Sequence, residues 1–446
     1  MIKSQDLIDK ICAKIAAGGL TALETCQTDG ALALLTAPVV SVATFSTLPS
    51  AVEYAGRMIY VDNENTYYHA VSGVWLKKLD SSPFYYRNDI WAWGDNFCGK
   101  IGDGTTVSKS SPVSVVGGFT DWCQVSSGGS TLAVRANGTL WAWGANNYGQ
   151  LGDGTTVAKS SPVSVVGGFT DWCQVAQGGF FSLGLRTNGT AWGWGNNIRG
   201  QLGDGTTFNQ SSPVSVIGGF TDWTRLEAAS TRSSFGLRTN GTLWSWGCNS
   251  YGQLGDGTIT SRLSPVSVVG GFTNWCQVSS GYKHTLGLRT NGTLWAWGYN
   301  GFNNGRLGDG TITDRSSPVS VIGGFTDWCR VSAGYANSFA IRTNGTLWSW
   351  GSNFSGSLGD NSVINKCSPI SVVGGFTDWC QLSTVGSTSQ GIRTNGTIWA
   401  WGSNSSGDIG DGTTVARSSP VSVIGGFTDW SQISDSSALR KVCKGF

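Results

Sequence analysis

Hydrophobic and polar residues along most of the chain fall into short runs that are typical of β-strands. In one stretch these runs are WCQVSS (122–127), TLAVRA (131–136), TLWAWG (139–144) and SPVSVV (161–166). Asn137-Gly138 lies between the second and third runs, and Asn-Gly favours a two-residue hairpin turn because its residues tolerate positive φ. The pattern therefore predicts four antiparallel strands in this stretch.

The same pattern occurs seven times, with a period of about fifty residues. A Trp-x-Trp-Gly core marks each copy, with its first Trp at Trp91, Trp141, Trp192, Trp244, Trp295, Trp348 and Trp399. A Gly-Asp-Gly or Gly-Asp-Asn turn, a Ser-Pro run and Gly-Gly-Phe-Thr follow each core. Seven four-stranded units predict an all-β fold, a seven-bladed β-propeller of antiparallel blades.

The two ends of the repeat region are complementary. The first copy has FYYR (84–87), which we expect to be its second strand, but lacks a run like WCQV, whereas the C-terminus has an extra run of that kind, WSQISDSS from Trp430. We predict that this C-terminal strand completes the first blade, because a closed ring leaves no long open sheet edge. The tail SALRKVC either adds to that blade or lies over it.

Residues before the repeat predict a small α+β segment. Leu7, Ile8, Ile11 and Ile15 form one apolar stripe on a predicted helix at 4–17. A lone helix of this length is marginal in water, so we expect it to attach to the rest of the chain, to a partner or to a second copy. The predicted parts are an attachment segment (1–30), a β meander and linker (31–80) and the propeller (81–446).

Composition narrows the function classes. Lys and Arg number 29 against 27 Asp and Glu, which predicts no electrostatic binding to nucleic acid or to a membrane surface. Every Trp except Trp75 belongs to a repeat, and we expect these rings to form the core. No Cys-x-x-Cys pair occurs, so we expect no zinc site. The start lacks a signal-peptide core and no apolar run is long enough to span a bilayer, which predicts a cytoplasmic or virion protein.

The repeated polar residues are interpreted as structural. One Asp in each Gly-Asp turn provides too few oxygens for a calcium loop, and Asp commonly bonds its own turn. An Arg before each hairpin and the Asp before the third Trp, which is Asn274 in one copy, are expected to pair with each other. Lys283 and His284 are adjacent, but no partner carboxylate can be named, so we assign no catalytic residue and no cofactor.

Variation between the copies is the better guide to binding. It falls in the loop between the first and second strands and in the loop after Trp-Gly, where exposed aromatic and basic residues favour a ligand surface. The candidates for binding a protein or a glycan are Phe180, Phe181, Arg199, Arg232, Tyr282, Lys283, His284, Phe302 and Tyr335. If one loop set shares one rim, most of them form an arc over four blades; drift at unselected loop tips is the alternative.

The unit LWAWGANNYGQLGDGT (140–155), with Pro162 and the preceding WCQVSSG, resembles the regulator of chromosome condensation repeat family. This resemblance implies a seven-bladed propeller. The founding member exchanges guanine nucleotide on a small nuclear GTPase and docks on nucleosomes, while other members serve in ubiquitin ligases, light sensing, lyase chemistry or plain binding. Nothing in this chain resembles the basic chromatin-binding tail, and fold alone does not fix function.

The segment 45–79, with Leu-Pro-Ser, the strand MIYV and Gly73-Val74-Trp75, resembles a short module of bacteriophage tail-fibre and other virion proteins. This second resemblance implies attachment to a virion protein. We therefore expect a non-enzymatic binding or structural protein, a tail fibre or capsid appendage that could bind a host receptor. A guanine-nucleotide exchange factor or other regulator of a small GTPase is the alternative, and a lyase or carbohydrate-active enzyme is a third class.

Overall fold

The structure is a computed structural model that describes residues 40–42, 58–61, 66–71, 74–77, 89–229, 232–424, 430–433 and 439–444. The chain divides into two compact units, residues 1–80 and 81–446. The predicted helix at 4–17, with Leu7, Ile8, Ile11 and Ile15, lies outside the described residues. The further division of the first unit at residue 30 stays a prediction.

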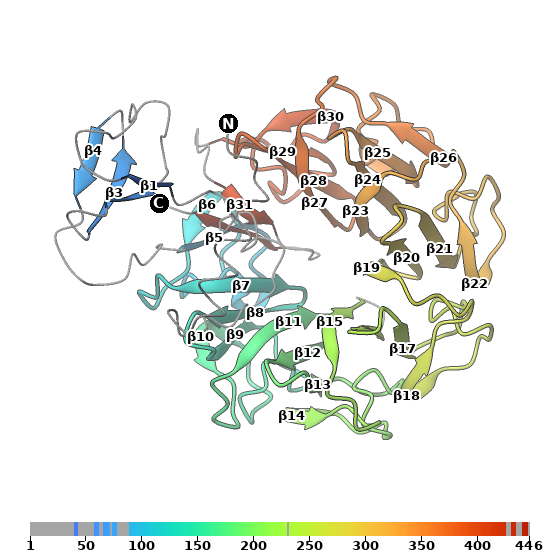
Figure 1. The fold of residues 1–446 in the computed structure, drawn as a ribbon, viewed down its shortest axis with the longest axis horizontal. Helices are drawn as coiled ribbons and strands as arrows, with labels where there is room; N and C mark the ends of the chain where they lie inside the picture. The colour runs from blue at the N-terminus through green and yellow to red at the C-terminus, as the bar shows by residue number, and fades with distance from the viewer. Residues whose placement is uncertain are drawn as a thin grey trace. The chain divides into compact units, whose positions relative to one another are not determined.

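The first unit contains one small sheet (Figure 1). Its strands are β1 (Val40–Val42), β2 (Met58–Val61), β3 (Thr66–Val71) and β4 (Val74–Lys77). They lie in the order β1-β2-β3-β4, with β1 parallel to β2 and the other pairs antiparallel. The segment predicted to hold a β meander (31–80) thus contains a sheet, in which β2, β3 and β4 pair in sequence order.

The second unit is a ring of seven four-stranded antiparallel sheets (Figure 1), which confirms the predicted propeller. Blade 1 consists of β31 (Trp430–Ile433), β32 (Leu439–Lys444), β5 (Asp89–Gly94) and β6 (Lys109–Ser114). Blade 2 consists of β7 (Trp122–Ser127), β8 (Ser130–Arg135), β9 (Leu140–Gly144) and β10 (Lys159–Ser164). Blade 3 consists of β11 (Trp172–Gln177), β12 (Phe181–Arg186), β13 (Ala191–Gly195) and β14 (Gln210–Ser215).

The remaining blades repeat this arrangement. Blade 4 consists of β15 (Trp223–Ala228), β16 (Ser233–Arg238), β17 (Leu243–Gly247) and β18 (Arg262–Ser267). Blade 5 consists of β19 (Trp275–Ser280), β20 (His284–Arg289), β21 (Leu294–Gly298) and β22 (Arg315–Ser320). Blade 6 consists of β23 (Trp328–Ala333), β24 (Asn337–Arg342), β25 (Leu347–Gly351) and β26 (Lys366–Ser371). Blade 7 consists of β27 (Trp379–Val385), β28 (Thr388–Arg393), β29 (Ile398–Gly402) and β30 (Arg417–Ser422), and the short 3-10 turns η3 (Phe97–Gly99) and η4 (Phe354–Gly356) lie in blades 1 and 6.

The first strand of each blade is the innermost. A glutamine ties neighbouring inner strands together: Gln124 Nε2 donates to Val175 O at 2.9 Å and Val175 N donates to Gln124 Oε1 at 2.7 Å. The inner strands line a central channel of about 430 Å³. Each fourth strand, at the outer edge, carries a Ser-Pro pair. Proline has no backbone N–H and so discourages pairing with another chain.

Both chain ends contribute to blade 1, with one correction to the expected arrangement. The strand order is β31-β32-β5-β6, so β31 completes the blade as predicted. The neighbour of β5 is β32, with Arg440 opposite Trp93, and this shows that the C-terminal tail adds to the blade. The prediction that FYYR (84–87) is the second strand is therefore wrong; these residues lie outside the described ones. β31 and β32 form the same pair of first and second strands as in the other blades, so β32 is hydrogen-bonded to a strand on each side.

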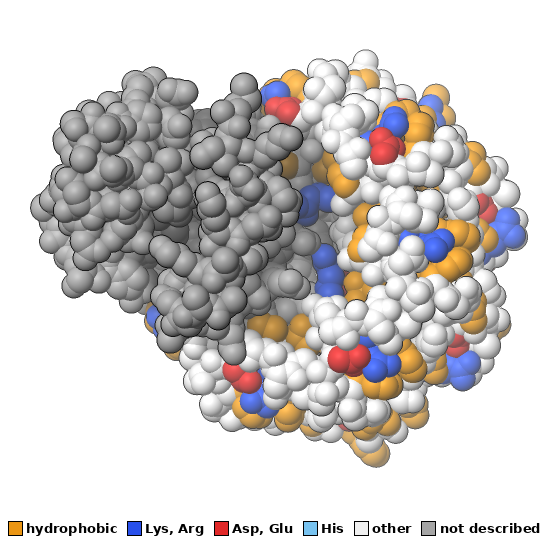
Figure 2. Space-filling model, viewed as in Figure 1, with side chains coloured by type: hydrophobic (Ala, Val, Ile, Leu, Met, Phe, Trp, Pro, Cys, Tyr) orange, Lys and Arg blue, Asp and Glu red, His pale blue; other side chains and the backbone are white. Residues whose placement is uncertain are grey.

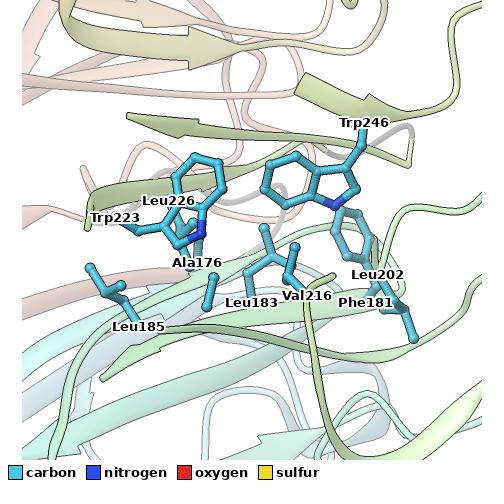
Figure 3. Close-up of a cluster of buried hydrophobic side chains, with 10 residues drawn as sticks. Ala176, Phe181, Leu183, Leu185, Leu202, Val216, Trp223, Leu226 and Trp246 are labelled. Carbon is cyan, nitrogen blue, oxygen red and sulfur yellow. The ribbon is translucent and has the colours of Figure 1, made fainter. Parts of the chain in front are cut away.

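The hydrophobic core lies between adjacent blades. In Figure 3 Phe181 and Leu183 of blade 3 pack with Trp223 and Trp246 of blade 4. The second Trp of each Trp-x-Trp-Gly core is fully buried and reaches the preceding blade. In blade 5, Trp297 Nε1 donates to Gln253 O of blade 4 at 2.9 Å.

A glycine makes room for this indole. A Cβ at Gly255 would lie 2.7 Å from Trp297 Nε1, far inside van der Waals contact. The same geometry recurs around the ring, and it closes the ring because a Cβ at Gly410 of blade 7 would lie 2.9 Å from Trp93 Nε1 of blade 1. The glycine of each Gly-Asp turn is thus required by the next blade.

Two glycine substitutions in one blade test this contact. Gly255 and Gly271 both have positive φ, 70° and 65°, so alanine costs roughly 1–2 kcal/mol of backbone strain at either position. Only at Gly255 does the new methyl meet the indole, which adds about 1–3 kcal/mol. We expect Gly255→Ala to lower the free energy of unfolding clearly more than Gly271→Ala in urea titrations followed by Trp fluorescence. Equal losses would contradict the inter-blade contact.

Candidate binding site

The repeated charged residues serve the blades. Arg135 Nε donates to Asp121 Oδ1 at 2.7 Å and its guanidinium lies 4.4 Å from the Phe119 ring centre. The Arg–Asp pair recurs in blades 3, 4, 6 and 7, and Figure 2 shows acidic and basic side chains next to each other around the ring. The pairing predicted for these two sets is therefore confirmed within the blades.

The turn aspartates are also engaged. Asp256 Oδ1 accepts hydrogen bonds from Thr258 N at 3.0 Å and from Asn249 Nδ2 at 2.9 Å, and Arg262 lies 2.7 Å from its other oxygen. Burial raises the pKa of Asp256, but the bonds from Arg262 and Thr258 outweigh it and leave the pKa below its ordinary value. Among the described residues no three His, Cys, Asp or Glu side chains gather as a metal site would need.

Both variable loops of each blade lie on one face, which we call the loop face. The third strand runs antiparallel to the second, so it ends where the second begins, next to the loop from the first strand. Contacts between blades agree with this: the ring of Tyr148, after β9, lies 5.5 Å from that of Phe180, before β12. The opposite face carries the Asn-Gly turns, and we call it the hairpin face.

The predicted binding residues divide into three groups, two on this face and one buried. Phe180 and Arg199 are exposed and Arg232 is half-buried, and they lie on blades 3 and 4. Tyr282, Lys283, Phe302 and Tyr335 come together on blades 5 and 6. Phe181 and His284 are fully buried, which corrects their expected place at the loop tips. Each is the first residue of a second strand, and second strands are buried on both faces.

His284 is held inside blade 5. Its Nε2 lies 2.9 Å from Ser338 Oγ of blade 6. Burial, and then the charge of Arg306, lower its pKa well below the ordinary value, although a hydrogen bond with the Asn337 backbone acts in the opposite direction. His284 is therefore neutral at physiological pH and has no access to a ligand, which removes the acid–base pairing with Lys283 considered from the sequence.

Lys283 lies among four tyrosines, Tyr251, Tyr282, Tyr299 and Tyr335, which we call the tyrosine cluster. Lys283 Nζ donates to Tyr251 Oη at 3.0 Å and lies 4.2 Å from the centre of that ring. The rings of Tyr282 and Tyr335 stack at 4.2 Å across the boundary between blades 5 and 6. Partial burial lowers the pKa of Lys283, but the bond to Tyr251 and the nearby tyrosines outweigh it, so the pKa is raised. The ammonium therefore stays charged.

A cavity of about 370 Å³ opens beside the tyrosine cluster. Tyr282, Lys283, Tyr299, Phe302, Arg306 and Tyr335 line it, with residues of blades 6 and 7. Arg306 is only 3% exposed, its guanidinium lies 4.9 Å from the Tyr299 ring centre, and its Nη1 donates to Tyr335 O at 3.4 Å. Burial lowers the pKa of Arg306, yet a guanidinium remains charged at any physiological pH.

Sequence reasoning did not select Tyr251, Tyr299 or Arg306. One signal was present: Arg306 stands where blades 2 to 4 have Gln150, Gln201 and Gln253. The approach of Tyr251 and Lys283, which are 32 positions apart, depends on packing between blades and has no signature in one copy.

The comparisons with known proteins agree with this fold. The profile of the RCC1-like domain family matches residues 86–387. The ultraviolet-B receptor UVR8 of Arabidopsis thaliana is 28% identical over 243 residues, which are 53% of this chain and 54% of that protein. The human E3 ubiquitin-protein ligase HERC2 is 30% identical over 248 residues, 54% of this chain and 5% of HERC2. The matched part thus spans about half of the one relative and a small fraction of the other.

Solved structures show the same architecture. Human WBSCR16 superposes with a TM-score of 0.71 at 18% identity, over 80% of this chain and 99% of that one. Prp20p from Saccharomyces cerevisiae, described with its binding properties to Gsp1p and histones, superposes with a TM-score of 0.71 at 20% identity, over 81% and 92%. At such identities the likeness concerns the fold. Within the part of the chain that the structure describes, no helix is long and apolar enough to cross a membrane.

The burial of His284 predicts a pH dependence of stability. Below about pH 6.5 the unfolded chain binds a proton at this histidine, and the folded chain does not, so the free energy of unfolding falls by up to about 1.4 kcal/mol per pH unit. We expect His284→Asn, which copies Asn337 of blade 6, to show a weaker loss between pH 7.5 and pH 5.0 in urea titrations. His69 is common to both proteins. Identical pH dependences would contradict a buried, neutral His284.

Proposed function

Because the chain belongs to the RCC1-like domain family, we propose that it is a non-enzymatic binding protein that recognises another protein through its loop face. The observation that carries this proposal is the gathering of copy-specific aromatic and basic residues around one cavity on that face. The hairpin face, by contrast, repeats Asn-Gly-Thr in six copies. A face built from near-identical units offers little to discriminate between partners.

A small GTPase is the partner class that we place first. The related fold of Prp20p is described with binding to Gsp1p, and the family resemblance includes guanine-nucleotide exchange. This support favours a regulator over the appendage of a virus particle. A glycan remains the alternative ligand for the loop face, because aromatic rings and polar groups suit both.

Attachment to a virion protein is the second candidate. It rests on the resemblance of segment 45–79 to tail-fibre modules and on the small separate sheet that β1 to β4 form. In this case the first unit anchors the chain in a larger assembly and the loop face remains free for a ligand. Self-association through the first unit is a further prediction of the same kind.

Photo-crosslinking from single positions tests the use of the loop face. Benzoylphenylalanine replaces Phe302, which is 84% exposed on the loop face, or Thr187, which is exposed on the hairpin face as the matched control. With extract of the source cells and of any particles that they release, we expect crosslinks from Phe302 that excess unlabelled protein suppresses, and none from Thr187. Equal crosslinking from both positions, or none from Phe302, would overturn the proposal.

The identity of the crosslinked protein separates the two candidates. A GTPase whose bound guanine nucleotide is released faster on addition of this protein supports the regulator. A particle protein, together with this chain in the mass spectrum of purified particles, supports the virion role.

A further inference from the structure

We propose that the cavity beside the tyrosine cluster, which we call the Lys283–Arg306 cavity, binds a carboxylate in an acidic peptide segment of the partner. This inference rests on the proposed function, since it names the chemistry by which the loop face would recognise a protein. It follows from the charge of the cavity, from the contacts of Lys283 and from the combination of two basic residues with a longer loop in blade 5.

The lining of the cavity carries more positive than negative charge. Lys283 and Arg306 line it and none of its described lining residues is acidic, while the charge of Asp314, outside this lining, acts on Arg306 and favours its protonated form. The repeated basic residues of the outer strands are different: Arg262 and Arg315 lie 2.7 Å and 3.1 Å from the turn aspartates of their own blades. Among the described residues Lys283 makes no ion pair, and its polar contact is the hydroxyl of Tyr251. The cavity is therefore complementary to an anion.

The contacts of the tyrosine cluster argue against a cationic ligand. Several aromatic faces around a hollow commonly bind a cationic group. Here Lys283 Nζ already lies 4.2 Å, 5.1 Å and 5.4 Å from the ring centres of Tyr251, Tyr282 and Tyr299. The chain's own ammonium takes the place that a ligand cation would need, so the rings hold a positive charge at the wall of the cavity.

Blade 5 has Arg306 where blades 2 and 4 have a glutamine that bonds to the loop after the third strand. In blade 4, Gln253 Oε1 accepts a hydrogen bond from Tyr251 N at 2.9 Å and fixes the loop, and Gln150 does the same for Tyr148. A guanidinium has no acceptor, so Arg306 cannot make this bond. What it adds at the cavity wall is a permanently charged guanidinium, which attracts a carboxylate.

The loop before Arg306 is also unlike the others. The Leu307 N to Asn300 Oδ1 bond spans seven positions, whereas the corresponding bond in blade 4 spans five. This longer loop holds two residues at positive φ, Phe302 and Asn303, at 58° and 55°, which costs roughly 1–3 kcal/mol for each residue. The corresponding loops of blades 1 and 6 hold one such residue each, Cys98 and Ser355. The insertion, the strained backbone and Arg306 meet at the same cavity.

The walls indicate what accompanies the carboxylate. Phe302 of blade 5 and Phe354 of blade 6 both line the cavity and are 84% and 69% exposed. Large exposed rings next to fixed cations favour an acidic residue with an apolar or aromatic neighbour. A peptide can present both in adjacent side chains, and this is why we choose an acidic peptide over a free anion or an acidic sugar.

A labelled peptide provides the test. Fluorescein-Ser-Phe-Glu-Phe-Glu-Ser is titrated with the full chain by fluorescence anisotropy, and the same peptide with Gln for Glu is the ligand control. We expect the Gln peptide to bind at least about tenfold more weakly, since it removes the charge and keeps the shape. Equal binding of the two peptides would overturn the proposal.

Two substitutions and one control locate the site. Arg306→Gln and Lys283→Ala copy residues that other blades carry at these positions, Gln253 and Ala336, so the fold is expected to survive, and the thermal unfolding midpoint checks this. Each should weaken binding of the Glu peptide about tenfold. Lys109→Gln, which removes one positive charge beside Asp103 in blade 1, should leave it within about twofold. An unchanged affinity in folded Arg306→Gln would remove the cavity from the interface.

Competitors decide between the sources of the anion. Unlabelled Glu peptide should displace the probe at lower concentration than inorganic phosphate or sialyllactose; the reverse order would reject a peptide ligand. The result is separable from the crosslinking experiment. A partner crosslinked at Phe302 together with an unchanged affinity in Arg306→Gln would leave protein recognition in place and reject only the carboxylate.

Discussion

The propeller depends on the contact between one indole and one glycine at each boundary between blades. At the boundary of blades 4 and 5, Trp297 donates its N–H to Gln253 O and its ring occupies the space that a side chain at Gly255 would need. Because each of the larger buried clusters spans two blades, neighbouring blades share their cores. Stability then comes from nearest-neighbour interfaces, as in other repeat proteins, and closure by β31 and β32 supplies the last interface.

Arg306 occupies the position in blade 5 that Gln253 has in blade 4, and its backbone and side chain have different roles. The carbonyl of Arg306 accepts hydrogen bonds from Trp350 Nε1 and Ser338 Oγ of the next blade, at 3.0 Å and 2.7 Å. Its side chain, however, lines the cavity on the loop face. The backbone thus serves the ring whatever the residue type, and the side chain can differ from blade to blade. This division explains how one copy acquires two cations and an insertion while the ring remains intact.

The periodic part of the structure was predictable because its signals are local. Alternation, Asn-Gly turns and the Trp spacing predicted the strands, the seven blades and closure through Trp430. The wrong predictions concern burial and strand pairing, which depend on the neighbouring strands and blades. Phe181 and His284 looked like loop tips but begin strands that are buried on both faces, and β32 took the place expected for FYYR. Which loops meet depends on packing between copies, so Tyr251, Tyr299 and Arg306 could not be grouped from the sequence.

The central claim is that the repeated residues build the ring and the loops of blade 5 carry recognition. Exchanging residues 299–306 for residues 248–253 of blade 4 tests it directly, since the exchange removes the insertion and Arg306 but keeps every repeated residue. The measurement is the affinity of the exchanged protein for the crosslinked partner, with the thermal unfolding midpoint taken on the same sample. The account predicts an unchanged midpoint and an affinity at least about tenfold lower. A retained affinity, or a ring that no longer folds, would contradict it.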